Sequence, residues 1–122
     1  MEFKLIPIFQ TNIHTEGLNG NCMRASLASI FEISIDDIPS FEQMRKNKWK
    51  GAFKDWLKTI GYSLKETRLQ PDTSDFYIVL GNTNRGILHC VVGKNGTTVH
   101  DPHPSQTGLT SILKYWSFTQ II

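Results

Sequence analysis

The most regular hydrophobic pattern of the chain starts just after residue 21. Its apolar positions recur every three or four residues, which is typical of a helix with one buried face; they are Met23, Leu27, Ile30 and Phe31. Small Ala and Ser residues between them would let the helix pack closely on a neighbour. The Asn21 side chain can accept a hydrogen bond from a first-turn N–H. The pattern predicts a helix that begins at Cys22, with Asn21 as its N-cap.

A second helical pattern covers residues 51–61. Its apolar positions share one face; they are Phe53, Trp56, Leu57 and Ile60. Gly61 is suited to the C-terminal cap, because glycine adopts a left-handed backbone at little cost. Between the two patterns, Ser34 is placed to cap a single short turn that Pro39 helps to end.

Beyond Gly61 the pattern changes to the alternation and short apolar runs of β-strands. Strands are predicted at residues 62–68, 76–81, 88–93 and 115–122, and "KNGT" before Val99 predicts a tight hairpin turn. Residues 3–9, "FKLIPIF", contain a proline and suit an edge strand or an extended lead-in. Helices followed by strands predict an α+β fold, with helices packed on a mainly antiparallel sheet built from local hairpins.

Composition indicates one domain over residues 1–122. The chain is 39% hydrophobic and 20% charged, as in ordinary globular proteins, and its net charge of +2 gives no support for a nucleic-acid partner. The basic residues at positions 45–50 are explained by a solvated helix end. No apolar run of about 18 residues and no leader pattern is visible, so we expect no membrane partner and a cytoplasmic location. The two cysteines are then expected to be free thiols. The oligomeric state is open.

Candidate chemistry comes from Cys22, His89 and Asp101. A thiol at a helix N-terminus has a lowered pKa, because the unpaired N–H groups and the helix dipole favour the thiolate. His89 starts an apolar strand, and the predicted hairpin returns the chain so that Asp101 lies next to His89 and accepts its ring N–H. A nucleophile, a base and an orienting carboxylate form a triad. From residue type and order alone, a packed cysteine with an ordinary strand histidine is the favoured interpretation, and the triad is the alternative.

Other Cys and His residues lie close to His89 and Asp101 in the sequence. Strand alternation turns His89 and Cys90 to opposite faces, so Cys90 should point away from whatever His89 faces. A zinc site from the clustered His and Cys residues is not favoured, since no Cys-x-x-Cys or His-x-x-x-His pair exists, and we expect no metal or other cofactor. His100 should face away from Asp101. His103, between two prolines, either lines the site or belongs to a rigid loop.

The segments "GNCMRASLASIFEISIDDIP", "LHCVVGKNG" and "VHDPHPS" together resemble the papain-like cysteine peptidase superfamily. They are most similar to bacteriocin-processing leader peptidases and to small uncharacterised bacterial and phage proteins of the same layout. The resemblance implies a papain-like fold, with Cys22 as nucleophile, His89 as general base and Asp101 as orienting acid. Leader peptidases also carry a glutamine about six residues before the nucleophile, where this chain has Glu16. The resemblance to the small uncharacterised proteins, which share the "FQT" arrangement, implies Gln10 as the oxyanion-hole donor instead.

The residues that flank the thiol depart from the leader peptidases, which usually have Asp-Cys-Gly where this chain has Asn21-Cys22-Met23. Asn21 and His103 are candidate substrate-binding residues. The expected activity is thiol-dependent hydrolysis of a peptide, isopeptide or amide bond in a peptide or protein substrate, through a thioester; deamidation or acyl transfer would use the same residues. The alternative is an inactive papain-like domain that binds a peptide or a partner protein.

Overall fold

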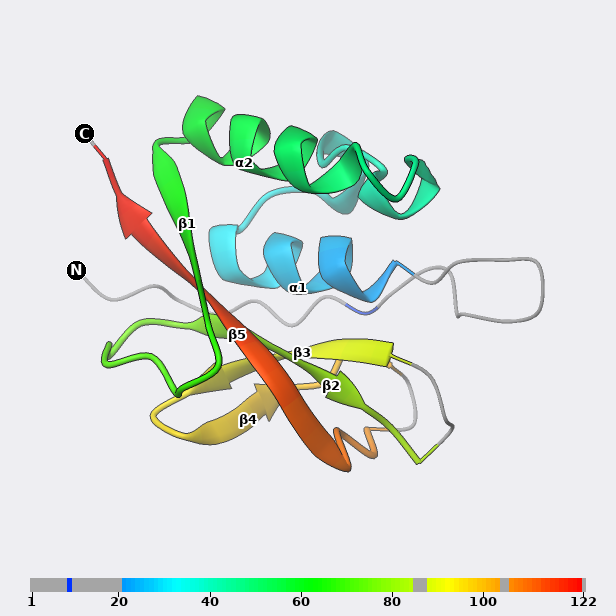
Figure 1. Cartoon of the computed structure of the whole chain (residues 1–122), viewed down its shortest axis with the longest axis vertical. Helices are drawn as coiled ribbons and strands as arrows, with labels where there is room; N and C mark the ends of the chain where they lie inside the picture. The colour runs from blue at the N-terminus through cyan, green and yellow to red at the C-terminus, as the bar shows by residue number, and fades with distance from the viewer. Residues whose placement is uncertain (1–8, 10–20, 85–87, 104–105, 122) are drawn as a thin grey trace.

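A computed structural model of the chain describes residue 9 and residues 21–84, 88–103 and 106–121. In these residues two α-helices lie on one side of a five-stranded antiparallel sheet, so the fold is α+β as the sequence predicts (Figure 1). Helix α1 (Cys22–Phe31) is the nearer of the two to the sheet and packs on strand β3 (Leu88–Lys94). Helix α2 (Trp49–Thr59) packs against β1 (Tyr62–Thr67).

Helix α1 begins at Cys22, as predicted, and buries a face that includes Leu27 and Ile30. Its small residues Ala25 and Ala28 are also buried, which brings the helix backbone close to the sheet. Asn21 holds the N-cap position and its carbonyl accepts the N–H of Ala25 at 3.0 Å, but its side chain does not cap the helix. The predicted capping bond is therefore wrong, and the Asn21 side chain is instead fully buried.

Two short 3₁₀ turns, η1 (Ile35–Asp37) and η2 (Phe41–Gln43), connect the helices. The Ser34 hydroxyl accepts the Asp36 N–H, which confirms the predicted cap. Helix α2 starts two residues before the predicted boundary, and Gly61 follows it with a left-handed φ of 87°.

The remaining strands are β2 (Tyr77–Asn82), β4 (Thr97–His100) and β5 (Ser111–Gln120), and the strand order is β1-β5-β2-β3-β4. Neighbours β2, β3 and β4 form local hairpins, but β5 inserts between β1 and β2. The expectation of a sheet made only from local hairpins is therefore wrong. The reason is burial: Trp116 of β5 is 1% exposed and pairs with Ile78 on one side and Glu66 on the other, a position that only a central strand provides.

The turn between β3 and β4 is the tight hairpin that the sequence predicts. Asn95 and Gly96 have φ values of 52° and 83°, the left-handed pair that a two-residue hairpin needs. The hairpin pairs Val92 with His100, so Asp101 continues the chain alongside the first half of β3. Residues 3–8 lie outside the described residues, and Phe9 is exposed and in no strand.

Candidate active site

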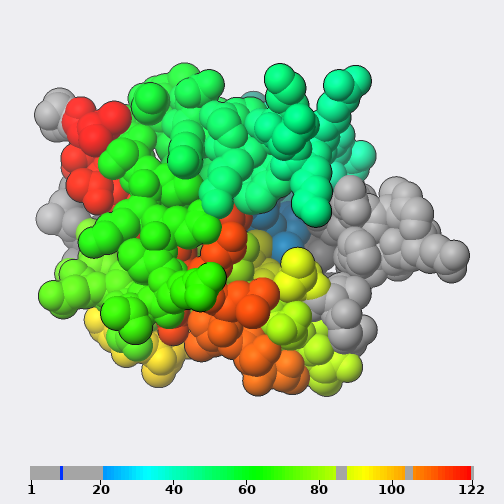
Figure 2. All heavy atoms as spheres, in the orientation of Figure 1, coloured from blue at the N-terminus to red at the C-terminus, as the bar shows by residue number. Residues whose placement is uncertain are grey.

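Cys22 occupies the first position of α1, where the N–H groups have no acceptor within the helix. The side chain is partly exposed and lines a pocket together with residues of β2, β3 and β5. Figure 2 shows the start of α1 at the bottom of a hollow between α2 and the lower end of β5. The helix end and its partial positive charge favour an anion at this sulfur. The local sequence thus places a thiol where a thiolate is stabilised and where solutes reach it.

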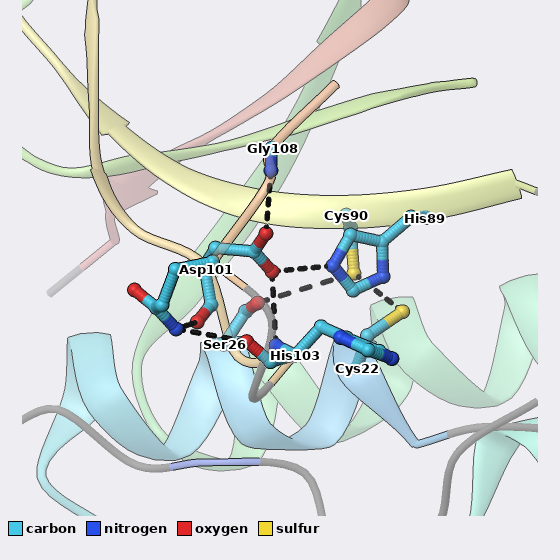
Figure 3. Close-up of polar contacts among 8 residues, drawn as sticks. Cys22, Ser26, His89, Cys90, Asp101, His103 and Gly108 are labelled. Carbon is cyan, nitrogen blue, oxygen red and sulfur yellow. Dashed lines mark hydrogen bonds and ion pairs between the residues drawn. The ribbon is translucent and has the colours of Figure 1, made fainter. Parts of the chain in front are cut away.

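His89 and Asp101 form a buried charged pair. The His89 Nε2–H donates to Asp101 Oδ1 at 2.6 Å, and both side chains are at most 4% exposed (Figure 3). The backbone N–H of His103 donates to the same oxygen at 2.9 Å, and the N–H of Gly108 donates to Oδ2 at 2.8 Å. Burial by itself opposes the carboxylate, but these hydrogen bonds outweigh it and lower the pKa of Asp101 to about 2. Asp101 is therefore a fixed anion beside the imidazole.

The other ring nitrogen of His89, Nδ1, faces Cys22 in Figure 3. Burial disfavours the imidazolium, but hydrogen bonds to Asp101 and Cys22, with the negative charge of both partners, raise the pKa of His89 to about 9. A hydrogen bond from Cys90 is the main cause that lowers the pKa of Cys22; burial opposes it, and the hydrogen bond and charge of His89 add to it. Both shifts favour a thiolate on Cys22 next to an imidazolium on His89.

Cys90 does not point away from this site. Its Sγ lies 3.2 Å from the Sγ of Cys22 and donates to it, and the Ser26 hydroxyl is 3.9 Å from the same Cys90 sulfur. The prediction from strand alternation is wrong on this point. Alternation fixes only the direction of each Cα–Cβ bond, and the hydrogen bond to Asp101 holds the His89 ring over the same helix end that Cys90 faces. Burial and the nearby Cys22 raise the pKa of Cys90, so it remains a thiol.

A largely apolar pocket of about 280 Å³ opens beside the thiolate. Cys22, His89 and Cys90 form one side of it, and Lys114 adds a second basic side chain to its lining. The apolar walls come from α1, β2, β3 and β5: Met23, Leu80, Leu88, Leu113 and Trp116. A larger cavity of about 440 Å³ lies on the other side of Met23, below η2 and the start of α2.

The structure brings Cys22, His89 and Asp101 together. His103 lies beside them, with its ring centroid 6.1 Å from that of His89 and nearly perpendicular to it. Asn21 is fully buried, so its side chain offers no surface to a substrate. Gln10 lies outside the described residues.

Sequence reasoning missed two contributors. Gly108 supplies a backbone N–H to Asp101 from a left-handed conformation with φ of 71°, and a glycine in a polar loop was the only available signal. Cys90 is the second: strand alternation predicts the wrong side for it, and its position next to His89 in the sequence is the signal for its place in the site.

Among the described ranges, no group of three or more His, Cys, Asp or Glu side chains is arranged to hold a metal ion. In the same part of the chain, no helix has the length and apolar character needed to cross a membrane. No family model, no curated protein and no solved structure matches this chain.

Proposed function

We propose that this protein is a papain-like cysteine hydrolase that cleaves a peptide, isopeptide or amide bond through a thioester. The observation that carries the proposal is the contact of one helix-end thiol with one imidazole, and of that imidazole with one buried carboxylate. Cys22 contacts His89, and His89 donates to Asp101 at 2.6 Å. A packed cysteine needs neither a charged histidine partner nor an open pocket beside it.

In the proposed reaction the Cys22 thiolate attacks the carbonyl carbon, and the His89 imidazolium gives its Nδ1 proton to the leaving amine. The resulting thioester is then hydrolysed by a water molecule that neutral His89 deprotonates. Asp101 holds Nε2–H throughout, so Nδ1 is the nitrogen that exchanges protons with the substrate. Because the pKa of Asp101 is about 2, this carboxylate accepts the hydrogen bond without taking the proton.

The N–H of Cys22 at the open end of α1 is the natural donor to the oxyanion, because the helix leaves it without an intrahelical acceptor. Gln10 remains the predicted second donor. Removing one such donor typically lowers the rate by about 10²–10³-fold.

The apolar pocket supports a substrate with a large apolar group near the reacting carbonyl. Its walls are mostly carbon, and two of its leucines, Leu88 and Leu113, are 69% and 48% exposed when nothing covers them. Burial of such side chains against an apolar group is favourable by about 25 cal/mol per Å². A peptide with a bulky aliphatic or aromatic residue satisfies this requirement.

The test compares wild type with Cys22→Ala on a peptide library derived from whole-cell digests, with cleavage products identified by mass spectrometry. We expect products with wild type that are absent with Cys22→Ala.

A second experiment measures thiol labelling. Iodoacetamide at mildly acidic pH should alkylate Cys22 much faster than Cys90, and His89→Ala should abolish this difference in rate. Slow and equal alkylation of both cysteines would refute the thiolate. Fast alkylation of Cys22 without any cleavage would instead favour the peptide-binding alternative.

A further inference from the structure

The two cysteines of the chain lie in the same site, and the proposed hydrolysis uses only one of them. Both residues line the pocket, but Cys22 is partly exposed whereas Cys90 is only 3% exposed. Their sulfurs are 3.2 Å apart, and a disulfide bond is about 2.05 Å long. A small movement of two side chains would therefore join them.

We propose that Cys22 and Cys90 form a reversible redox-modification site that takes a hydroperoxide as its oxidant. Cys22 is the sulfur that reacts with the peroxide, and Cys90 is the resolving thiol that closes an intramolecular disulfide. The proposal goes beyond hydrolysis and does not require it, because it needs only the geometry of the two sulfurs and access to one of them.

The first step is attack of the Cys22 thiolate on one oxygen of the peroxide. An S–O bond forms, the O–O bond breaks, and hydroxide or an alkoxide leaves and takes a proton to become water or an alcohol. Cys22 is then a sulfenic acid, oxidised by two electrons, and the peroxide has been reduced by two electrons.

In the second step the Cys90 sulfur attacks the Cys22 sulfur. The S–S bond forms as the S–O bond breaks, and the leaving hydroxide combines with the Cys90 thiol proton to give water. The positions suit this order, since Cys22 is the more exposed of the two cysteines and the nearly buried Cys90 has its sulfur 3.2 Å away. A dithiol reductant reverses the reaction.

The local surroundings assign the two roles without ambiguity. A hydrogen bond from His89 and the N-terminus of α1 stabilise the anion on Cys22. Cys90 is packed among core side chains of α1 and the sheet and has the Ser26 hydroxyl 3.9 Å away. An external thiol would meet Cys22 first, whereas Cys90 is already in contact before any oxidant arrives.

The disulfide would inactivate Cys22 as a nucleophile and would also protect it from further oxidation. A sulfenic acid without a nearby thiol proceeds to sulfinic acid, which ordinary thiols do not reduce. With Cys90 in contact, closure of the disulfide competes with that second oxidation. The oxidised protein would be inactive and recoverable.

The test uses the full chain, reduced and then exposed to increasing hydrogen peroxide, with free thiols blocked afterwards and intact masses measured under non-reducing conditions. Wild type should lose the mass of two hydrogens, show the mass of a single chain and take up no blocking reagent. Dithiothreitol should return it to the starting mass. Cys90→Ala should instead gain two or three oxygens on Cys22 and resist dithiothreitol. Cys22→Ser should remain unmodified at the same peroxide concentration.

Cys90→Ser serves as a second variant in case Cys90→Ala does not fold, and circular dichroism checks both. Accumulation of sulfinic acid on Cys22 in wild type as fast as in the Cys90 variants would overturn the proposal. So would a disulfide that joins two chains, recognised because less of it forms when the oxidation is run at lower protein concentration. Because every readout is a mass, a failure here is distinguishable from a failure to cleave peptides.

Discussion

The Nε2–H of His89 donates to Oδ1 of Asp101 at 2.6 Å, and that carboxylate is itself held by the backbone N–H groups of His103 and Gly108. The carboxylate is thus fixed by the main chain on one side and fixes the imidazole on the other. This relationship determines which ring nitrogen is left for Cys22 and keeps the imidazole charged at neutral pH.

Asp101→Asn should reduce catalysis much more than folding. The amide has no charge to stabilise the imidazolium and can offer an N–H where an acceptor is needed, so we expect kcat to fall by about 10²–10⁴-fold. The measurement is kcat for any peptide found in the library screen. Thermal unfolding of the same variant provides the control. The alkylation rate of Cys22 should also fall at mildly acidic pH, because a weaker imidazolium no longer holds the thiolate; unchanged alkylation would contradict the assigned role.

The pH dependence of kcat/KM should be bell-shaped. On the acid side activity is lost when Cys22 is protonated, and its lowered pKa moves that limb below the ordinary range of a thiol. On the alkaline side activity falls as His89 loses its proton with a pKa of about 9, because the leaving amine then receives no proton. His89→Ala should move the alkylation midpoint of Cys22 upward. An alkaline limb near the ordinary histidine pKa of about 6.5 would contradict the ion pair.

Acid should destabilise the fold through Asp101. Its folded pKa of about 2 lies below the unfolded value of about 3.9, so its contribution to stability is present above the unfolded pKa. That contribution is lost as the pH falls through about 2. The free energy of unfolding, measured by urea denaturation, should therefore decrease over this interval in wild type. Asp101→Asn should be less stable at neutral pH and should show a smaller acid-dependent loss; an equal loss would show that Asp101 is not responsible.

Two glycine substitutions form a matched pair. A Cβ at Gly81 would lie 1.9 Å from the backbone oxygen of Ser111, where β2 and β5 shift register. Gly81→Ala should therefore separate these strands and destabilise the protein by roughly 2 kcal/mol or more. Gly51 lies in α2, and nothing lies within 4 Å of the Cβ that alanine would add there. Gly51→Ala should therefore stabilise the protein by about 0.5–1 kcal/mol, because alanine favours the helix more than glycine does. Chemical denaturation of both variants checks the two signs, and similar effects would contradict the described contact.

Ala28→Leu tests whether close packing of α1 on the sheet positions the nucleophile. Ala28 is 1% exposed and belongs to the core cluster that contains Cys90 and Val92 of β3. A larger side chain would push the helix away at a cost of about 1–3 kcal/mol. Both the free energy of unfolding and the alkylation rate of Cys22 should fall. Ala52→Leu, at a partly buried position of α2, is the control that should leave alkylation unchanged.

Local features of this fold could be predicted because their causes are local. The spacing of Leu27 and Ile30 predicts a helix that starts at Cys22, and the Asn95-Gly96 turn predicts the return of the chain. Since only 12 residues and one tight turn separate His89 from Asp101, the sequence was enough to predict their contact. Sequence alone did not predict the position of β5, because the pairing of Trp116 with Ile78 depends on which strands share the core.

The sequence by itself determined where a thiol meets a helix end and which carboxylate lies beside the histidine, because helix starts and hairpin turns are set by neighbouring residues. Only the tertiary structure decided that the Cys22 sulfur lies next to the His89 ring and 3.2 Å from Cys90, which is 68 residues away. These contacts depend on the packing of the small residues of α1 on β3. Burial of a shared core, which no local pattern encodes, brings the two sulfurs and the imidazole into one site.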